Sequence, residues 1–381
     1  MIALAFATLA LVGVAFALVA TIATLMAPRG GAREDRPAIV LLRCAEALDD
    51  ELGARWSKDS TAYSGAIRRV VVVPAGGVVG GAHVVASGIA ANVVGNRKSL
   101  QLAMAHREAE TMGWLDARTI VVHADADVEL GPGDLDRLVE AVDDRTVAFA
   151  VPAPRGGAKL AELTARAIVT ASPQAFAVVC GLARMTRSAP ALAGKLVAIP
   201  APLLDRICGY ETLVGSIGDD VALVDAVTAR GGQIRMARVA AVAVDERRTF
   251  RSLNAQLARW LRVASLHRPG LLWAYPTVVA SLPIALVLAP FHPMAALAFG
   301  GLYGARLVLG LILLLGPYRG RSSIWALAFL PLGDLLLLRA ALAAAGSTSV
   351  TWSGRVYHLG KGGSIETVEA GAVAAATKVP R

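Results

Sequence analysis

Several residue types that define protein classes are scarce in this sequence. It holds three widely spaced cysteines, Cys44, Cys180 and Cys208, and six scattered histidines. No disulfide framework is therefore indicated, and a metal site held by cysteine or histidine is not expected. Charged residues make up only 18% of the chain, against about 25% in an average soluble protein. Together with 55% hydrophobic residues, this shortage indicates membrane segments.

The excess of positive charge does not indicate a nucleic-acid-binding protein. Lysine and arginine number 38 against 29 acidic residues, which gives a net charge of +9. These basic residues form no run of five and no stripe interleaved with aromatic side chains, so nucleic acid is not expected as a partner. Arginines beside apolar stretches instead mark the cytoplasmic ends of membrane segments.

The first long apolar run predicts a membrane anchor at the start of the chain. Ile2–Met26 carries no charged side chain and is long enough to span a bilayer, and Arg29, Arg33 and Arg36 follow it. A cleaved signal peptide has a positive segment before a shorter apolar core. We therefore expect residues 1–27 to be an uncleaved transmembrane anchor that leaves the next domain in the cytoplasm.

Three further apolar stretches predict two or three transmembrane helices within residues 269–345. They are Leu271–Pro290, Met294–Leu315 and Ile324–Ala345. The third contains Asp334 and Arg339, each of which costs about 3 kcal/mol at the centre of a bilayer. This stretch either finds partners in a helix bundle or is re-entrant or interfacial. The side of the membrane on which the C-terminal tail, residues 346–381, lies depends on that choice.

Residues 36–248 have the pattern of a soluble α/β domain. Short apolar runs predict strands at Ala38–Arg43, Val70–Pro74, Thr119–Ala124 and Val147–Pro152. Helical patterns alternate with them at Leu48–Trp56, Asn96–Trp114, Asp134–Val142 and Asp220–Arg230. This order predicts a mostly parallel sheet, whose ligands bind beyond the carboxyl ends of the strands.

The segment V-V-H-A-D-A-D-V, residues 121–128, is the strongest candidate for a metal site. Asp125 and Asp127 follow a predicted strand, and side chains two residues apart in extended chain point to the same side. Mg²⁺ and Mn²⁺ prefer oxygen ligands, often one or two carboxylates together with substrate phosphates. The motif therefore fits a metal–diphosphate site, and a solvated turn is the alternative. A second D-x-D, at Asp134 and Asp136, is explained by helix capping.

Two later segments carry further candidate residues. Asp219 and Asp220 lie in I-G-D-D-V at a predicted helix start, where they either complement the helix dipole or provide a base for a substrate hydroxyl. Gln256, Arg259 and Trp260 lie in N-A-Q-L-A-R-W-L-R. They belong to residues 249–268, whose leucines share one face and predict an amphipathic helix on the membrane surface.

Taken together, D-A-D, then G-D-D, then Q-L-A-R-W before membrane helices resembles a family 2 glycosyltransferase. The likeness is greatest to the ceramide glucosyltransferase-like branch, which includes bacterial hopanoid-associated enzymes. Supporting stretches are C-G at 180–181, C-G-Y-E at 208–211 and the tail T-W-S-G-R-V-Y-H-L at 351–359. The resemblance implies a GT-A fold and a single sugar transfer from a nucleotide-sugar, a UDP-sugar, to a lipid hydroxyl such as that of ceramide or a hopanoid.

The resemblance also assigns roles to the acidic residues. Asp125 and Asp127 match the motif that binds a divalent cation, Mg²⁺ or Mn²⁺, and the donor diphosphate. Asp220 matches the general base, and Asp219 stands where the family has a glutamate. The displacement is inverting in the family. The implied setting is a bacterial cell membrane with the catalytic domain in the cytoplasm.

Two more groups are carried over from the family. Gln256, Arg259 and Trp260 match the Q-x-x-R-W element, which contributes to the diphosphate and acceptor sites. Asn96 and Lys98 resemble an N-x-K stretch on the donor side.

One departure from the family keeps other functions open. Members usually have an acidic residue after the second strand, where this chain reads V-V-V-P-A-G-G. A catalytically inactive membrane scaffold is therefore one alternative. A processive polysaccharide synthase, which shares D-x-D and Q-x-x-R-W, is another.

Overall fold

The computed structural model describes residues 36–90, 93–155, 159–186, 190–244, 249–270, 281–315, 324–345 and 349–370, with scattered positions near the N-terminus. The anchor predicted for residues 1–27 lies almost entirely outside the described residues, as does the first half of the apolar stretch Leu271–Pro290.

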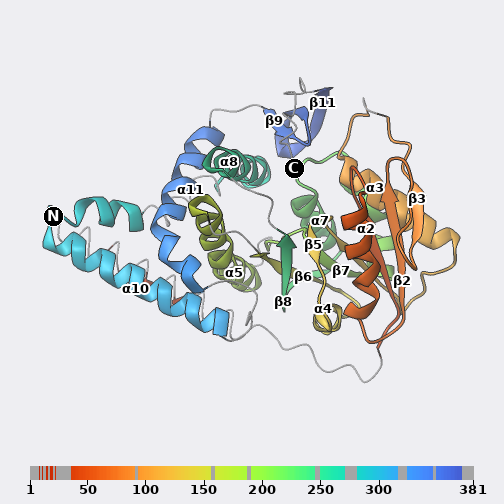
Figure 1. The fold of residues 1–381 in the computed structure, drawn as a ribbon, viewed down its shortest axis with the longest axis horizontal. Helices are drawn as coiled ribbons and strands as arrows, with labels where there is room; N and C mark the ends of the chain where they lie inside the picture. Colours follow the sequence, from red (N-terminus) through yellow and green to blue (C-terminus); the bar gives the residue numbers. More distant parts are fainter. Residues whose placement is uncertain are drawn as a thin grey trace.

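A mixed eight-stranded sheet forms the centre of the α/β domain (Figure 1). Its spatial order is β3 (His83–Ala86), β2 (Ile67–Val73), β1 (Ile39–Cys44), β4 (Ile120–Ala124), β7 (Leu196–Pro200), β6 (Thr146–Arg155), β8 (Gln233–Val244) and β5 (Val128–Glu129). The first four strands are parallel, as are β6 and β8, whereas β7 and β5 run antiparallel to their neighbours. The four strands predicted from apolar runs are confirmed as β1, β2, β4 and β6, and the predicted α/β domain with a mostly parallel sheet is confirmed.

Helices cover both faces of this sheet because its strands are apolar at successive positions, whose side chains point to opposite faces. One face packs against α3 (Arg97–Thr111), α6 (Ala201–Arg206) and α7 (Asp219–Ala229). The other packs against α2 (Asp50–Ser57) and α4 (Asp134–Val139). The carboxyl end of β4 lies close to the N-termini of α3 and α7, because Lys98 of α3 contacts both Asp125 and Asp219.

A group of long helices lies beside this domain. Figure 1 shows α5 (Leu160–Thr186), α8 (Phe250–His267) and α11 (Leu330–Ala345) between the sheet and α10 (Pro293–Leu315), which extends away from it. Leucines and alanines of α5, α8 and α11 form one buried cluster. Arg306 of α10 forms an ion pair with the buried Asp334 of α11, so Asp334 has a partner within the helix group.

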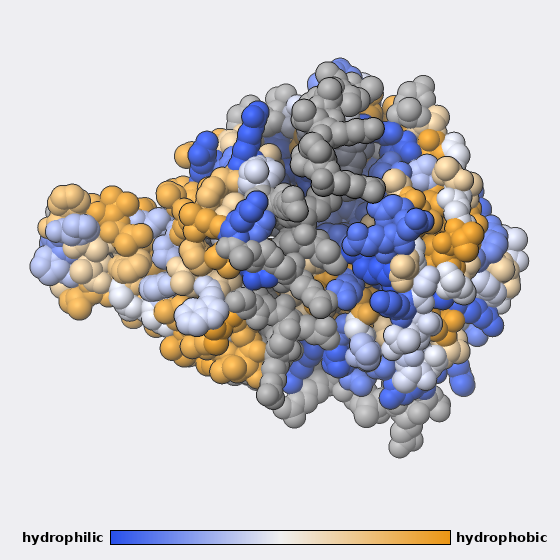
Figure 2. All heavy atoms as spheres, viewed as in Figure 1, coloured by the Kyte–Doolittle hydropathy of each residue, from blue (hydrophilic) through white to orange (hydrophobic). Residues whose placement is uncertain are grey.

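Two helical stretches among the described residues are long and apolar enough to cross a membrane, Pro293–Ile312 and Ile324–Ala345. Both stretches meet this criterion by length and composition alone, and the core helix of a soluble protein meets it too. Apolar side chains gather on the surface at this end of the molecule (Figure 2).

The tail folds back onto the α/β domain. Strands β9 (Ser349–Trp352), β10 (Arg355–Leu359) and β11 (Ile365–Ala370) form a separate antiparallel sheet. The backbone N–H of Ile217 donates to the Gly363 carbonyl at 3.0 Å, and that of Ile365 donates to the Gly215 carbonyl at 2.9 Å. The tail sheet is thus bonded to the loop that leads into α7.

Candidate active site

The D-A-D turn is fixed to the edge of the sheet by its backbone. β4 ends at Ala124, and the next residue, Asp125, donates its backbone N–H to the Lys195 carbonyl at 2.8 Å. The carbonyl of Asp125 then accepts the N–H of Val128 at 3.1 Å. The two carboxylates therefore project from a closed turn and not from a free loop.

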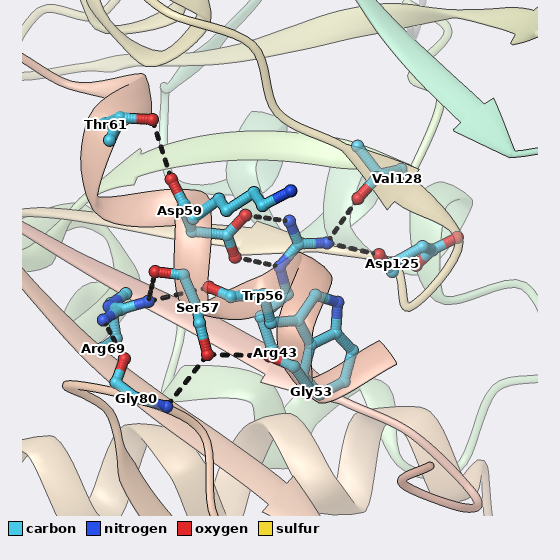
Figure 3. A network of polar contacts seen from close by, with 11 residues as sticks. Arg43, Gly53, Trp56, Ser57, Asp59, Thr61, Arg69, Gly80, Asp125 and Val128 are labelled. Atoms are coloured by element: carbon cyan, nitrogen blue, oxygen red, sulfur yellow. Dashed lines mark hydrogen bonds and ion pairs between the residues drawn. The ribbon is translucent and has the colours of Figure 1, made fainter. Parts of the chain in front are cut away.

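A buried arginine on β1 holds this turn from behind (Figure 3). The guanidinium of Arg43 donates to the carbonyls of Asp125 at 2.7 Å and Val128 at 2.9 Å. Its other side makes two 3.0 Å bonds to the carboxylate of Asp59, and it lies over the ring of Trp56. Sequence reasoning missed Arg43, although a single arginine within the apolar strand I-V-L-L-R-C was a signal for a buried ion pair.

Lys98 joins two of the predicted acidic motifs. Its ammonium lies 2.7 Å from the Asp125 carboxylate and 3.1 Å from that of Asp219, and it donates to the Gly194 carbonyl at 3.1 Å. Burial opposes the charged form, but the two carboxylates raise the pKa of Lys98 well above its ordinary value. The structure thus brings together residues from α3, the end of β4 and the start of α7.

A second lysine, which sequence reasoning also missed, lies on the other side of the D-A-D turn. The ammonium of Lys195 is 2.5 Å from Asp127 and 3.5 Å from Asp125. Lys195 directly precedes β7, and no motif in the surrounding sequence indicates a role for it. The Oδ1 oxygen of Asp127 is buried without a hydrogen-bond partner among the described residues. An unpartnered buried carboxylate oxygen beside a second carboxylate fits the ligand set of a divalent cation.

Asp220 has the properties of a proton acceptor. One of its carboxylate oxygens accepts the backbone N–H of Gly194 at 3.2 Å. Burial and the neighbouring Asp219 carboxylate raise the pKa of Asp220 to about 7.

Asn96 has a positioning role in the described structure. It is fully buried and caps α3 by accepting the N–H of Ser99 at 3.3 Å. Its amide nitrogen donates to the Ser216 carbonyl at 3.1 Å, in the loop that precedes Asp219. Contact between Asn96 and the donor, as the resemblance implies, stays a prediction.

The Q-x-x-R-W residues lie on α8, and the predicted helix over 249–268 is confirmed as Phe250–His267. The guanidinium of Arg259 lies 5.9 Å from the centre of the Trp352 ring in the tail sheet, and Trp260 is 42% exposed. The end of α8 reaches the start of α7, because His267 lies 3.3 Å from the Ser216 hydroxyl. The roles of Gln256, Arg259 and Trp260 at the diphosphate and acceptor sites stay predictions.

Comparison with known proteins gives the following matches. The profile of the family described as "Glycosyl transferase family 21" matches residues 90–365. No curated protein matches the chain. A mannosyltransferase from Pyrobaculum calidifontis, solved with GDP-Man and Mn²⁺, is similar at 18% identity and a TM-score of 0.48, over 91% of this chain and 98% of that one. Glucosyl-3-phosphoglycerate synthase from Mycobacterium tuberculosis, solved with Mn²⁺, UDP and glucosyl-3-phosphoglycerate, is similar at 18% identity and a TM-score of 0.36, over 62% of this chain and 81% of that one.

Proposed function

Because the chain belongs to glycosyltransferase family 21 and is a glycosyltransferase, we propose that it moves a single sugar from a UDP-sugar to a hydroxyl group of a membrane lipid. The observation that carries this proposal is the convergence of Asp125, Lys98 and Asp219 beside Asp220. In such a cluster, a cation held by the carboxylates and the ammonium group of Lys98 could bind a diphosphate, and Asp220 beside them could act as a base. Within this family, the ceramide glucosyltransferase-like branch is the one that the motifs support.

Asp125 and Asp127 are the residues that would hold the divalent cation, Mg²⁺ or Mn²⁺. When bound, such a cation neutralises charge on the leaving diphosphate. Both carboxylates face lysines, so the cluster already contains positive charge that a diphosphate can contact. Lys98 and Lys195 would then bind the donor by the same attraction.

Asp220 would remove the proton of the acceptor hydroxyl. The hydroxyl oxygen forms a bond to the anomeric carbon as the bond from that carbon to the diphosphate breaks, and the proton passes to the Asp220 carboxylate. A pKa of about 7 suits this role because the group is partly ionised at neutral pH and can still hold the proton that it receives. Attack from the side opposite to the diphosphate inverts the anomeric carbon.

The acceptor is proposed to be a lipid because α8, the helix that follows the α/β domain, packs among helices with exposed apolar side chains. α8 carries the exposed Trp260 and packs against α11, and large apolar side chains are exposed on α10 and α11. Figure 2 shows that these apolar groups continue to one end of the molecule. A helix at a membrane surface beside the cluster would admit the head group of ceramide, a hopanoid or another lipid from the cytoplasmic side of a bacterial cell membrane.

Membranes that contain the protein, incubated with labelled UDP-sugars and divalent cation, test this function. We expect one labelled glycolipid in the lipid extract, and its loss in Asp220→Asn. Asp144→Asn, which changes an exposed carboxylate at the turn before β6, is the matched control and should retain activity. Labelled polymer would identify a processive synthase instead. No labelled product from any nucleotide-sugar would identify an inactive scaffold.

A further inference from the structure

Three potential metal ligands meet at the far end of α3. His106 and Glu110 are one helical turn apart on α3, and Asp205 lies on α6. One ligand atom from each lies within 4.8 Å of the other two, and Nε2 of His106 is 4.0 Å from a carboxylate oxygen of Asp205. Two separate elements therefore contribute to one cluster.

The histidine of this cluster is buried and its outer nitrogen is unsatisfied. His106 is only 4% exposed, and its Nε2 has no hydrogen-bond partner among the described residues. The ring packs edge-on against Tyr210, with 6.0 Å between the ring centres. A buried polar nitrogen without a partner is unfavourable unless something absent from the chain itself bonds to it.

We propose that His106, Glu110 and Asp205 bind a zinc-like divalent cation. One imidazole nitrogen and two carboxylates are a donor set that suits Zn²⁺ and its neighbours in the first transition row, with water as a further ligand. Tetrahedral bonds of about 2 Å separate the ligand atoms by roughly 3.4 Å. The two carboxylates are on exposed residues, so small rotations of their side chains bring the set to that spacing.

This site is distinct from the cation site at the D-A-D turn. His106 follows Lys98 by eight residues on α3, which places it about 12 Å further along the helix. The two places are connected through Tyr210, whose hydroxyl is 2.9 Å from Nδ1 of His123, on the strand that leads to Asp125. A cation there would tie α6 to α3 and thereby support the side of the sheet on which the acidic cluster lies.

This site was not expected from the sequence, because no two histidines have ligand spacing and the third ligand is about a hundred residues from the other two. Only the packing of α6 against the same face as α3 brings Asp205 to them.

The test measures the zinc that binds to the purified full-length protein in detergent. The parent protein for this test carries Asp125→Asn and Asp127→Asn, which remove the carboxylates of the D-A-D turn as competing ligands. We expect one Zn²⁺ per chain after dialysis, by elemental analysis, and a thermal unfolding midpoint that rises with Zn²⁺. His106→Gln and Asp205→Asn should each weaken zinc binding by at least about tenfold. His83→Gln, at a histidine paired with Glu108 on the same side of the domain, should retain it.

Equal zinc binding in His106→Gln, Asp205→Asn and the parent would mean adventitious surface binding and would overturn the proposal. So would the absence of zinc from the parent. Because Glu110 and Asp205 are exposed, Glu110→Gln and Asp205→Asn keep the test decisive even if His106→Gln does not fold. The result does not depend on the sugar-transfer activity.

Discussion

At the scale of single residues, the ammonium group of Lys195 contacts the same carboxylates that a cation would need. It is 2.5 Å from Asp127 and 3.5 Å from Asp125, while Lys98 pairs with the other side of Asp125. A cation bound at the unpartnered Oδ1 oxygen of Asp127 would be repelled by the ammonium group of Lys195, which pairs with Oδ2. The same ammonium group would lie beside the proposed position of the donor diphosphate and could attract it.

Lys195→Met should therefore change two binding constants in opposite directions. Loss of the competing ammonium should tighten Mn²⁺ binding by about tenfold, and loss of its attraction for the diphosphate should raise the KM for the nucleotide-sugar by about tenfold. Electron paramagnetic resonance of free Mn²⁺ measures the first effect without turnover, and initial rates measure the second. Lys58→Met, at an exposed lysine, is the control. If both constants weaken together, Lys195 does not compete with the cation.

If Asp220 is the base, as proposed, the reaction should depend on pH with a defined sign. Burial and Asp219 raise its pKa to about 7, and the base acts only when deprotonated, so kcat/KM should rise with pH through about 7 and then level off. Asp219→Asn removes a neighbouring negative charge and should move the rise to lower pH by about one unit. Rates measured between about pH 5.5 and 9 check this. A rise that stays in place or moves upward would show that another group titrates.

The same raised pKa has a cost in stability. Because the folded protein holds the Asp220 proton more tightly than an unfolded aspartate with a pKa of about 3.9, this group lowers the free energy of unfolding as pH rises from about 4 to about 7. Asp220→Asn removes this contribution. Urea unfolding should therefore show a smaller loss of stability over that range in the variant than in the parent, with no gain at the acid end.

At the scale of elements, Arg43 connects β1, the segment that contains Asp59, and the turn after β4. Removing one partner of a buried ion pair costs about 3 kcal/mol or more, because the other charge is left unpaired. Asp59→Asn should lower the free energy of unfolding by about that amount, and Arg43→Lys should also lower it because lysine cannot make the paired bonds. Chemical denaturation measures both effects.

The turn itself provides a second readout for Arg43. In the fraction of Arg43→Lys that is folded, the D-A-D backbone loses bonds to the guanidinium, so Mn²⁺ should bind more weakly than in the parent. Arg68→Lys, at an exposed arginine on the neighbouring strand β2, should change neither the free energy of unfolding nor Mn²⁺ binding. Unaltered Mn²⁺ binding in Arg43→Lys would limit the arginine to a role in stability.

The elements that the sequence predicted well are those with a strong local pattern. The apolar runs of β1, β2, β4 and β6 are buried on both faces, and α8 has both a regular apolar stripe and a capping box at Thr249 and Ser252. Strand β7 was not predicted, because its position between β4 and β6 depends on pairings far apart in the chain. Lys195 and Arg43 were missed for the same reason: their partners come from other elements.

At the scale of the whole molecule, the tail is bonded to the α/β domain. Backbone bonds join Gly363 to Ile217 and Ile365 to Gly215. If the helices between residues 268 and 349 cross a membrane, they must therefore do so an even number of times. Two arrangements meet this condition: Ile324–Ala345 crosses together with α10, or it is re-entrant and leaves two other crossings.

Cysteine labelling tests this arrangement. In a variant without its native cysteines, Glu366→Cys in β11 and Asp50→Cys in α2 place single thiols at exposed positions of the tail and the domain. An impermeant maleimide should label both in inverted membrane vesicles and neither in intact spheroplasts. Labelling of the two thiols from opposite sides would show that the contact between the tail and the α7 loop does not form.

The backbone bonds between residues 363–365 and the loop before α7 also have a consequence for the proposed glycolipid product. If the chain glycosylates a membrane lipid, an active site and a tail held together at one face of the bilayer would leave each new head group in the leaflet where the lipid was taken up. Sugar hydroxyls lose their hydration in hydrocarbon, so such a product would not cross the bilayer quickly by itself. A cell that displays it on its outer surface would then need a separate flippase to carry it across.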